Sequence, residues 1–560
     1  MSERTDACDV LVVGSGAAGL SAACVAAAGG LRVLLAEASP LVGGTTAISG
    51  GMVWIPANHH MSEAGCPDSV AAARSYLAHT VPPGDDGGLL EAFVHTGDAA
   101  LHHLEQVTAL RLRPVLRYPD YYPDLPGATA GGRVLEPHPF DATVLGPWFA
   151  KLRPPLPEFM VFGGMMVHRS DIPHLRRFAR SPASAWRVLQ LLARHARERL
   201  TAPRGTTLHL GNALAGWLLH SALRAGVDIR TSAPVLSLRR EGEGFGSATL
   251  AIDGRAQTLR IRRAVVLAGG GISHDATLRR AHVPASAGTL SATVASGAQA
   301  SGAALALALG AHIAGGTRQA FWVPASRFTR RDGSAGVFPH TVTDRGKPGL
   351  IAVAQDGRRF VNEALSYHEF VKGQLAAGPR ALPAWLVCDR RFLWRYGLGA
   401  VQPFALSVSR HITSGNLKTG RTLAELAGAC KLPSAVFEQT VAGFNDDARR
   451  GTDTQFGRGS DIYQRHLGDA LCQPNPCLAP IEHAPYFAVA VEPADLGMAA
   501  GLATDANARV LGADGRPIPG LYACGNDMAS PMNGAYPGPG ITLGPALVFA
   551  CRAAQDLLRG

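Results

Sequence analysis

The chain has 560 residues, of which 47% are hydrophobic and 17% are charged. This composition is too apolar for a disordered protein, and the length exceeds what one simple core can use, so we expect two closely packed domains. The formal net charge of +10 is spread along the chain and no nucleic-acid-binding motif accompanies it, which argues against a nucleic acid as partner.

The location of the protein follows from its apolar segments and its cysteines. Met1 to Asp6 lead directly into an apolar segment and lack the features of a secretion signal. The most apolar early stretch, residues 17–28, is short and rich in Ala and Gly, which does not suit a membrane span. The nine cysteines show no spacing typical of a disulfide framework or a metal site. We therefore predict a cytoplasmic protein without a metal.

A dinucleotide-binding motif begins the chain. A valine-rich run, residues 9–13, is typical of a buried parallel strand and leads into Gly14-x-Gly16-x-x-Gly19 and an Ala-rich helix. Gly14 permits a tight turn, Gly16 lets the backbone approach a pyrophosphate, and Gly19 lets the helix pack closely on the strand. A second strand, residues 32–37, ends in an acid, Glu37, that can bind a ribose hydroxyl. The residues expected to hold the dinucleotide here are Gly14, Gly16, Ala17, Ala18, Gly19 and Glu37.

The next segment, Gly43 to Gly51, indicates which dinucleotide is bound. Its small and hydroxyl-bearing residues allow the chain to pass close to a broad, flat ring. Here the chain resembles the fumarate reductase and succinate dehydrogenase flavoprotein superfamily, whose members hold FAD with a similar run. Covalent members attach the flavin through a histidine in this run, whereas threonines stand here, so the resemblance implies noncovalent FAD. The expected contacts are Gly43, Gly44, Thr45, Thr46, Ser49, Gly50 and Gly51.

Two later segments resemble other parts of the same FAD domain. One is a strand that runs into Ala268 and Gly269, and the other is a strand that ends at Gly525 and Asn526. The resemblance implies an α/β fold: a discontinuous Rossmann-like FAD-binding domain with an inserted α+β catalytic cap domain. The expected parts are 1–289 and 481–560 for the FAD-binding domain, with 144–210 as a basic enlargement, and 290–480 for the cap.

No second nicotinamide-binding motif follows, because the glycines at 269–271 lack its spacing. We therefore expect the substrate to reduce the flavin and an external quinone-like or dye-like acceptor to reoxidise it.

A Pro/Gly-rich loop, Tyr536-Pro-Gly-Pro-Gly540, precedes the apolar segment expected to form the last helix. The free N–H groups at a helix start can stabilise negative charge on the flavin, and the candidate donors are Ile541, Thr542 and Leu543. A rigid turn is the alternative. The loop resembles that of the 3-ketosteroid Δ1-dehydrogenases, which implies that the Tyr536 hydroxyl and the Gly540 N–H bind the steroid C3 carbonyl.

Two further tyrosines fall in segments that resemble the same family. Residues 357–367 resemble the segment ending in the catalytic tyrosine, so Tyr367 would remove the C2 proton while flavin N5 accepts hydride from C1. Because a tyrosine with a pKa of about 10 is a poor base near neutrality, it needs a helper. The motif Tyr118-Pro-Asp-Tyr121-Tyr122 makes Tyr121 the better match and leaves Tyr122 as the alternative. A single tyrosine is more often a half-buried structural residue than a catalytic one. Three tyrosines in three segments that resemble the family favour a catalytic site.

Other functions remain open on the sequence. A 3-ketosteroid Δ4-dehydrogenase shares the fold without the usual Tyr-Pro-Gly-Pro-Gly loop. Fumarate-type reduction of a carboxylate or enoate needs arginines and histidines to clamp a dianion, and their signature loops are missing. A non-catalytic flavoprotein that binds nucleic acid or membrane would use only the basic region, so the three tyrosines argue against it.

The basic region spans residues 169–204 and holds nine arginines against two acids, interleaved with large apolar residues. It could be an amphipathic helix on an anionic membrane surface, compatible with a bulky sterol taken from the membrane. An arginine-rich helix that is solvated on one face and packed on the other is the favoured alternative. Phe321, Trp322 and Val323 could line a steroid slot or the core.

Overall fold

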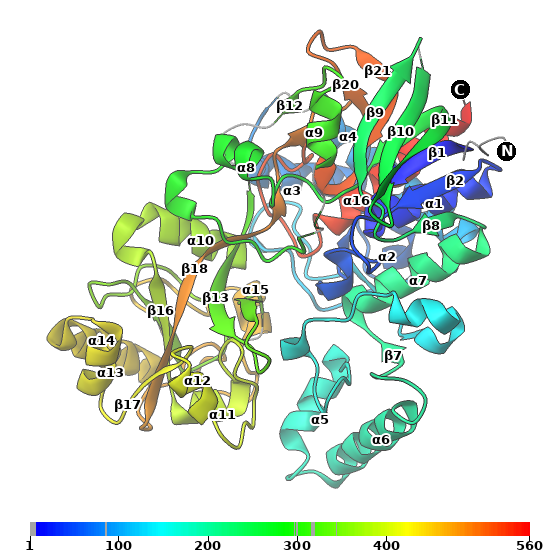
Figure 1. Cartoon of the computed structure of the whole chain (residues 1–560). Coiled ribbons are helices and arrows are strands. Elements are labelled where there is room, and N and C mark those ends of the chain that lie inside the picture. The colour runs from blue at the N-terminus through cyan, green and yellow to red at the C-terminus, as the bar shows by residue number, and fades with distance from the viewer. Residues whose placement is uncertain are drawn as a thin grey trace.

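Figure 1 shows the computed structural model, which describes residues 7–84, 87–242, 244–295, 297, 301–314, 320–342 and 344–559. The expectation for Met1 to Asp6 lies outside these residues. Two lobes are visible, and the first and last parts of the chain both lie in the upper one. The described helices include none with the length and apolar character of a membrane span.

The upper lobe is built on a sheet with strand order β20-β21-β11-β1-β2-β8, in which every neighbouring pair except β20 with β21 is parallel. Its strands are β1 (Ala7–Val13), β2 (Val33–Ala36), β8 (Asp228–Arg230), β11 (Arg255–Leu267), β20 (Arg509–Leu511) and β21 (Pro517–Ala523), and β9 (Val235–Glu241) and β10 (Gly244–Ile252) extend it as an antiparallel hairpin on β11. Val10, Leu11 and Val12 are completely buried, as the valine-rich run predicts for a strand covered on both faces.

Helices from distant parts of the chain cover this sheet. Helix α1 (Ala17–Ala28) contacts α7 (Leu210–Arg224) and the last helix, α16 (Leu543–Arg559), which also contacts α4 (Leu89–Val107). Every residue of α1 from Ala17 to Ala26 is buried. Because most of these side chains are small, neighbouring helices can approach α1 closely. The two ends of the chain therefore build one lobe.

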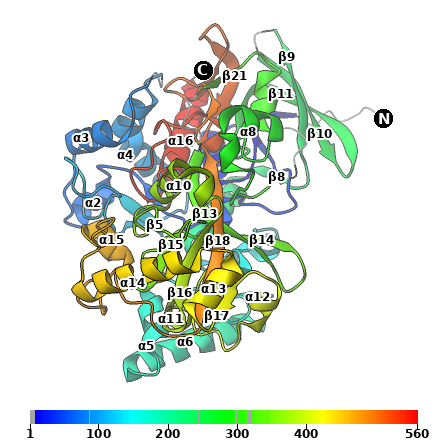
Figure 2. The ribbon, with the colours of Figure 1, turned by 90° about the vertical axis from the view of Figure 1, so that its left-hand side faces the viewer.

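The second lobe holds an antiparallel sheet with strand order β14-β13-β18-β16-β15, and β17 also pairs with β18. The strands are β13 (Ala320–Thr329), β14 (Ala335–Pro339), β15 (Leu350–Val353), β16 (Ala384–Asp389), β17 (Lys418–Gly420) and β18 (Tyr486–Met498). Helix α10 (Tyr367–Ala376) contacts β13, while α13 (Leu423–Cys430) and α14 (Ser434–Arg450) lie at the outer end of the lobe (Figure 2). Because β18 pairs with three strands here, this sheet continues past the boundary expected at residue 480.

The basic region forms two helices, α5 (Ile172–Arg177) and α6 (Pro182–Glu198), instead of one. They lie at the bottom of Figure 1, next to the second lobe. Helix α6 buries Leu191 but leaves Trp186 and Leu189 63% and 54% exposed. Its apolar surface is therefore only partly covered.

The remaining helices and strands are short. They are α2 (His59–Glu63), α3 (Val70–Thr80), α8 (Ala276–His282), α9 (Gly302–Leu307), α11 (Arg390–Tyr396), α12 (Ser409–Thr413), α15 (Ile462–Leu467), β3 (Val53–Trp54), β4 (Leu112–Pro114), β5 (Val134–Pro137), β6 (Phe140–Asp141), β7 (Thr207–Leu208), β12 (Ile313–Ala314) and β19 (Gly501–Leu502).

Candidate active site

One continuous cavity of about 2450 Å³ connects the glycine motif with the space between the lobes. Gly16, Glu37 and Thr46 line its inner end, and residues of α5, α6 and the segment 396–411 line its outer end. Between them lie four tyrosines: Tyr118, Tyr121, Tyr367 and Tyr536. The predicted nucleotide site and the predicted tyrosine site are thus parts of the same cavity.

The three glycines of the first motif have the separate geometries that their expected roles require. Gly14 has a φ of 101°, and a Cβ added there would lie 2.3 Å from the Ala268 oxygen. At Gly19 an added Cβ would lie 2.0 Å from the Gly14 oxygen, where helix and strand meet. At Gly16 it would meet nothing closer than the Thr46 hydroxyl, 3.7 Å away. Gly16 therefore keeps space free on the cavity side, as a pyrophosphate needs.

The acid after β2 is fixed by the glycine loop itself. Ser15 donates hydrogen bonds to Glu37 Oε2 from its backbone N–H, at 3.0 Å, and from its hydroxyl, at 2.5 Å. The N–H of Ser39 donates to the other carboxylate oxygen at 2.8 Å. Glu37 is held in one orientation while it lines the cavity, which suits an acceptor for ribose hydroxyls.

The Thr45-Thr46 pair connects this loop with distant segments. The Thr46 hydroxyl accepts a hydrogen bond of 3.0 Å from the N–H of Ala17, in the first turn of α1. The Thr45 hydroxyl accepts one of 3.0 Å from the N–H of Val294. Both side chains are small enough for the chain to line the cavity closely, and no histidine stands at either position.

Asp527 supports the glycine turn after β11 and was missed by the sequence reasoning. Its carboxylate accepts hydrogen bonds from the N–H groups of Gly269, at 2.5 Å, and Gly271, at 2.8 Å. Burial raises the pKa of Asp527 to about 6. Its neighbour Asn526 lines the cavity. In the sequence, the only sign that Asp527 has a role is that an acid directly follows Gly525 and Asn526.

Most residues expected to contact the cofactor line this cavity. Three do not line it. Gly19 lets α1 pack against the glycine loop, Gly43 lies in a turn with positive φ, and Ile541 is buried behind the cavity wall. Those that line the cavity are Gly14, Gly16, Ala17, Ala18, Glu37, Gly44, Thr45, Thr46, Ser49, Gly50, Gly51, Ala268, Gly269, Gly525, Asn526, Thr542 and Leu543.

Three tyrosines from distant segments pack against one another. The ring centroids of Tyr367 and Tyr536 are 5.1 Å apart, those of Tyr121 and Tyr536 are 5.7 Å apart, and those of Tyr121 and Tyr367 are 5.8 Å apart. Tyr122 lies elsewhere, because its hydroxyl donates a hydrogen bond of 2.8 Å to Glu369 and its side chain does not line the cavity. Of the two neighbouring candidates, only Tyr121 belongs to the cluster.

The hydroxyl groups of the cluster are neutral in the free protein. Burial raises the pKa of Tyr536 to about 12 and that of Tyr121 well above 10. Burial also raises the pKa of Tyr367 well above 10. The nearby Tyr536 raises this pKa further, whereas the Tyr121 hydroxyl lowers it. Among the described residues, the Tyr121 hydroxyl has no hydrogen-bond partner of normal geometry. A buried polar group of this kind invites a polar atom of a ligand.

The loops that carry Tyr121 and Tyr536 are tied together below the cavity. The N–H of Tyr121 donates a hydrogen bond of 3.0 Å to the Pro537 oxygen. The Trp54 indole donates one of 2.8 Å to Asp120 and lies against Gly538, where an added Cβ would be 2.5 Å from the indole nitrogen. These contacts fix both tyrosines to one rigid support.

Gly540 makes a similar close approach to the chain at Met52 and Trp54. It has a φ of 102°, and a Cβ there would lie 2.5 Å from the Met52 oxygen. Its own carbonyl accepts hydrogen bonds from the N–H groups of Trp54, at 3.2 Å, and Gly544, at 2.9 Å. The second bond begins α16, so the N–H groups of residues 541–543 belong to the unpaired first turn, as the sequence predicts for a helix start.

Tyr367 is positioned by the start of α10. Ser366 caps this helix, because its hydroxyl accepts a hydrogen bond of 3.2 Å from the N–H of Glu369. The completely buried Arg345 donates hydrogen bonds of 3.0 and 3.2 Å to the carbonyl oxygens of Glu363 and Leu365. The chain on both sides of Tyr367 is therefore fixed.

Phe321 supports the cluster from behind, with its ring centroid 5.5 Å from that of Tyr536. Phe321, Trp322 and Val323 are buried and do not line the cavity, so they belong to the core.

Beyond Tyr118 the cavity wall carries basic side chains, among them Lys347 and Arg176. The His466 ring lies 4.5 Å from the Tyr118 ring, and burial lowers the pKa of His466 to about 4. Burial also lowers the pKa of Lys347 to about 8, although its ammonium donates to two backbone carbonyls. The Arg176 guanidinium lies 5.3 Å from the Tyr396 ring centroid and has no carboxylate within ion-pair distance among the described residues. This part of the wall favours an anionic group.

Comparison with known proteins agrees with the site. A family model described as FAD binding domain matches residues 9–543. The chain is 38% identical to the 4-oxocyclohex-2-ene-1-carboxylate 5-dehydrogenase of Sinomonas cyclohexanicum, over 99% of this chain and 94% of that protein. It is 37% identical to the 3-oxosteroid 1-dehydrogenase of Mycobacterium tuberculosis H37Rv, over 98% of each.

A solved structure is also similar throughout. It is the crystal structure of 3-ketosteroid delta1-dehydrogenase from Sterolibacterium denitrificans in complex with 1,4-androstadiene-3,17-dione, with a TM-score of 0.90, 36% identity, and coverage of 99% of this chain and 100% of that one. The predicted family and the FAD cofactor are confirmed. The chain is an FAD-dependent oxidoreductase, and it belongs to the FAD-binding flavoprotein family that includes the 3-ketosteroid Δ1-dehydrogenases.

Proposed function

We propose that this protein catalyses the FAD-dependent 1,2-desaturation of 3-ketosteroids. The packing of Tyr121, Tyr367 and Tyr536 against one another in the FAD cavity carries this proposal. A carbonyl at this cluster meets neutral hydroxyl donors in a site that largely excludes water. Similar relatives are named as 3-oxosteroid dehydrogenases, and the lining of the cavity as a whole is mainly apolar, which suits a steroid.

The substrate carbonyl binds to the Tyr536 hydroxyl and the Gly540 N–H. Both groups then stabilise the enolate that develops as a proton leaves the neighbouring carbon. Because Tyr536 is buried and neutral, it donates a hydrogen bond in a low-dielectric site, where such a bond is worth more than in water.

Tyr367 removes the C2 proton in its deprotonated form, after its phenolic proton has left, and Tyr121 helps by donating a hydrogen bond that stabilises the Tyr367 oxyanion. Burial alone opposes this role, because it raises the pKa of Tyr367. The polarised carbonyl must therefore make the C2 proton more acidic as Tyr367 accepts it. Bound FAD, held without a covalent bond beside Thr45 and Thr46, supplies the hydride acceptor for C1, and an external quinone-like acceptor takes up the electrons.

A second candidate is the desaturation of a 4-oxocyclohexane carboxylate. Arg176 favours it: its side chain lines the cavity and has no carboxylate within ion-pair distance in the described part of the chain, so it could bind a carboxylate remote from the ketone. Two similar proteins of Sinomonas cyclohexanicum are named as dehydrogenases of such ring carboxylates, one of 4-oxocyclohexanecarboxylate and one of 4-oxocyclohex-2-ene-1-carboxylate. The chemistry at the tyrosines would be the same, and only the substrate skeleton would differ.

Product analysis separates these functions. The enzyme is incubated with an artificial electron acceptor and, in separate reactions, with androst-4-ene-3,17-dione, a 5α-saturated 3-ketosteroid and 4-oxocyclohexanecarboxylate. We expect a new 1,2-double bond in both steroids. A 4-ene product from the 5α-steroid without 1,2-desaturation would instead indicate a Δ4-dehydrogenase, and turnover of the carboxylate alone would favour the second candidate.

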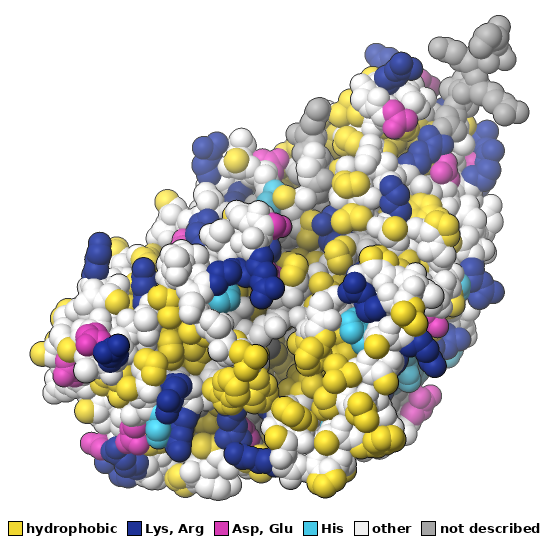
Figure 3. Space-filling model, turned by 60° about the horizontal axis from the view of Figure 1, so that its bottom comes forward, with side chains coloured by type: hydrophobic (Ala, Val, Ile, Leu, Met, Phe, Trp, Pro, Cys, Tyr) yellow, Lys and Arg dark blue, Asp and Glu magenta, His cyan; other side chains and the backbone are white. Residues whose placement is uncertain are grey.

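We also propose that the outer end of the cavity rests on an anionic membrane surface. Phe162, Phe178 and Leu406 line the cavity and are 62%, 49% and 96% exposed. Hydrophobic side chains and Lys/Arg side chains gather on this face (Figure 3). Exposed apolar side chains together with arginines suit binding to anionic lipids, and a steroid could then enter from the bilayer.

Vesicle sedimentation tests this surface. The protein should sediment with vesicles that contain anionic lipid and much less with zwitterionic ones. Replacing Trp186 and Leu189 with Ala should weaken binding, whereas Leu116→Ala, an exposed leucine outside the basic region, should not. Equal binding by both variants would contradict the proposal.

A further inference from the structure

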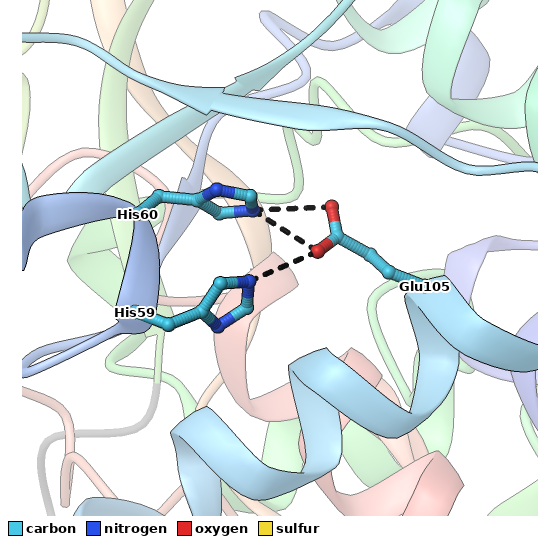
Figure 4. A group of neighbouring side chains, drawn as sticks. All are labelled: His59, His60 and Glu105. Atoms are coloured by element: carbon cyan, nitrogen blue, oxygen red, sulfur yellow. Dashed lines mark hydrogen bonds and ion pairs between the residues drawn. The ribbon is translucent and has the colours of Figure 1, made fainter. Parts of the chain in front are cut away.

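Two adjacent histidines at the start of α2 point at one carboxylate of α4 (Figure 4). The distance from His60 Nε2 to Glu105 Oε2 is 3.0 Å, and that from His59 Nε2 to the same oxygen is 3.2 Å. The three side chains are 16%, 23% and 11% exposed in the order His60, His59 and Glu105, so solvent ions can reach them. The cluster lies outside the cavity described above.

When His59 is neutral, hydrogen bonding does not account for both of the carboxylates that its ring faces. His59 Nδ1 lies 2.7 Å from Asp98 Oδ1, while its Nε2 faces Glu105. A neutral imidazole donates from only one nitrogen. If Nδ1 donates to Asp98, the lone pair of Nε2 faces the lone pairs of a carboxylate. A cation between Nε2 and Glu105 removes this repulsion.

The geometry is close to that of a tetrahedral metal site. Zinc bonds to nitrogen and oxygen are about 2.0 Å long, which places neighbouring tetrahedral ligand atoms roughly 3.3 Å apart. The measured separations of 3.0 and 3.2 Å are near this value, and all three ligand atoms lie within 4.8 Å of one another. Only small side-chain movements would complete the site.

The surroundings also resemble those of a metal centre. Ligating histidines usually donate their other ring N–H to a carboxylate, which fixes the tautomer, and Asp98 stands at that position beside His59. Glu105 Oε1 accepts a hydrogen bond of 3.0 Å from the N–H of Leu112, which turns Oε2 toward the histidines. Two of the three ligands, His59 and Glu105, are thus oriented by a neighbour.

We propose that His59, His60 and Glu105 bind a zinc ion, with water as the fourth ligand. The sequence predicts no metal, and this proposal departs from that prediction. The sequence gives no hint of the site because adjacent histidines lack the usual spacing of metal ligands and Glu105 comes 45 residues after His60. The ion would fasten α2 to α4. It would act as a structural brace between these two helices, outside the tyrosine cavity.

Calorimetric titration of the chelator-treated, FAD-loaded protein with zinc tests this site. We expect one zinc per chain and a higher unfolding temperature with zinc present. His60→Ala and Glu105→Gln should each lose this binding, and Asp98→Asn should weaken it by about 10-fold to 100-fold. Glu105→Gln keeps an oxygen for the Leu112 N–H, so its fold should persist.

His79→Ala is the matched control, because His79 is exposed on the neighbouring α3, where its ring contacts the Ser75 carbonyl oxygen and no carboxylate of the described residues. It should bind zinc as the wild type does. Flavin content and steroid turnover should remain at the wild-type level in all variants. The proposal is overturned if the wild type binds no stoichiometric zinc, or if Glu105→Gln and His60→Ala bind it as tightly as the wild type.

Discussion

The backbone N–H of Tyr121 donates a hydrogen bond of 3.0 Å to the carbonyl oxygen of Pro537, the residue after Tyr536. Tyr76 donates to the same oxygen at 2.6 Å from its hydroxyl. The proposed helper and the proposed carbonyl-binding tyrosine therefore share one support. Tyr367 comes from the second lobe, so the complete cluster exists only when the two lobes are joined.

Replacing Tyr367 with Phe tests the proposed base. The variant should retain FAD, but flavin reduction by steroid should slow by about 100-fold to 10,000-fold, the usual contribution of general base catalysis. Rapid mixing under anaerobic conditions measures this rate. Tyr122→Phe is the matched control and should react like the wild type, because the Tyr122 hydroxyl binds Glu369 outside the cavity. Equal rates in Tyr367→Phe and wild type would exclude Tyr367 as base.

Replacing Tyr536 with Phe removes a donor to the developing enolate. Loss of one such donor typically costs about 100-fold to 1000-fold in rate, so kcat should fall by this factor. The ring contacts with Tyr121 and Tyr367 remain possible, and the fold should persist. Steady-state kinetics with a 3-ketosteroid measure the effect, and an unchanged kcat would assign the carbonyl to other groups.

The pH dependence of kcat/KM reports the base in the free enzyme. Because the pKa of Tyr367 is raised well above 10, the fraction of its deprotonated form increases about tenfold per pH unit below that pKa. Where proton removal limits the rate, kcat/KM should therefore rise with pH up to at least about pH 10. A plateau near neutral pH would point to a histidine or carboxylate base instead.

Gly16→Ala should lower FAD affinity without unfolding the protein. The new methyl group has space in the protein but occupies the cavity side that the pyrophosphate approaches. Gly14→Ala should impair folding itself, because its Cβ would collide with the Ala268 oxygen at a φ of 101°. Flavin retention on gel filtration and thermal unfolding separate the two effects. Normal FAD affinity in Gly16→Ala would contradict the assigned role.

Asp527→Ala should also weaken FAD binding. It removes the acceptor of the N–H groups of Gly269 and Gly271, so the glycine turn loses two hydrogen bonds to a carboxylate. The glycine turn on the cavity wall should then become less ordered. Titration of the apoprotein with FAD measures this, with Asp514→Ala in an exposed turn as the control. Unchanged affinity would limit Asp527 to a local structural role.

The sequence predicts the parts of the fold and site that depend on short local patterns. The glycine spacing gives the turn at β1, and a valine-rich run gives the buried strand. Tyr367 and Tyr536 are found because they stand in recognisable segments. Asp527 and the Asp120–Trp54 contact depend on residues that only meet in three dimensions, so the sequence alone did not indicate them.

The limits of the sequence are clearest at the second lobe and the basic region. β18 follows the expected domain boundary, yet it pairs with β13, β16 and β17, because strand pairing is not restricted by sequence order. The choice between Tyr121 and Tyr122 depends on which neighbouring side chain faces the cavity. The arginine-rich region forms two helices that carry both exposed and buried apolar residues. The periodicity of the sequence cannot tell which of these apolar residues are buried.

Anaerobic mixing of the FAD-loaded enzyme with androst-4-ene-3,17-dione tests the central claim most directly. The account predicts rapid loss of the oxidised flavin absorbance in the wild type, formation of the 1,4-diene, and neither change on this time scale in Tyr367→Phe. If the wild-type flavin stays oxidised with the steroid but is reduced by 4-oxocyclohexanecarboxylate, steroid desaturation is not the function of this protein.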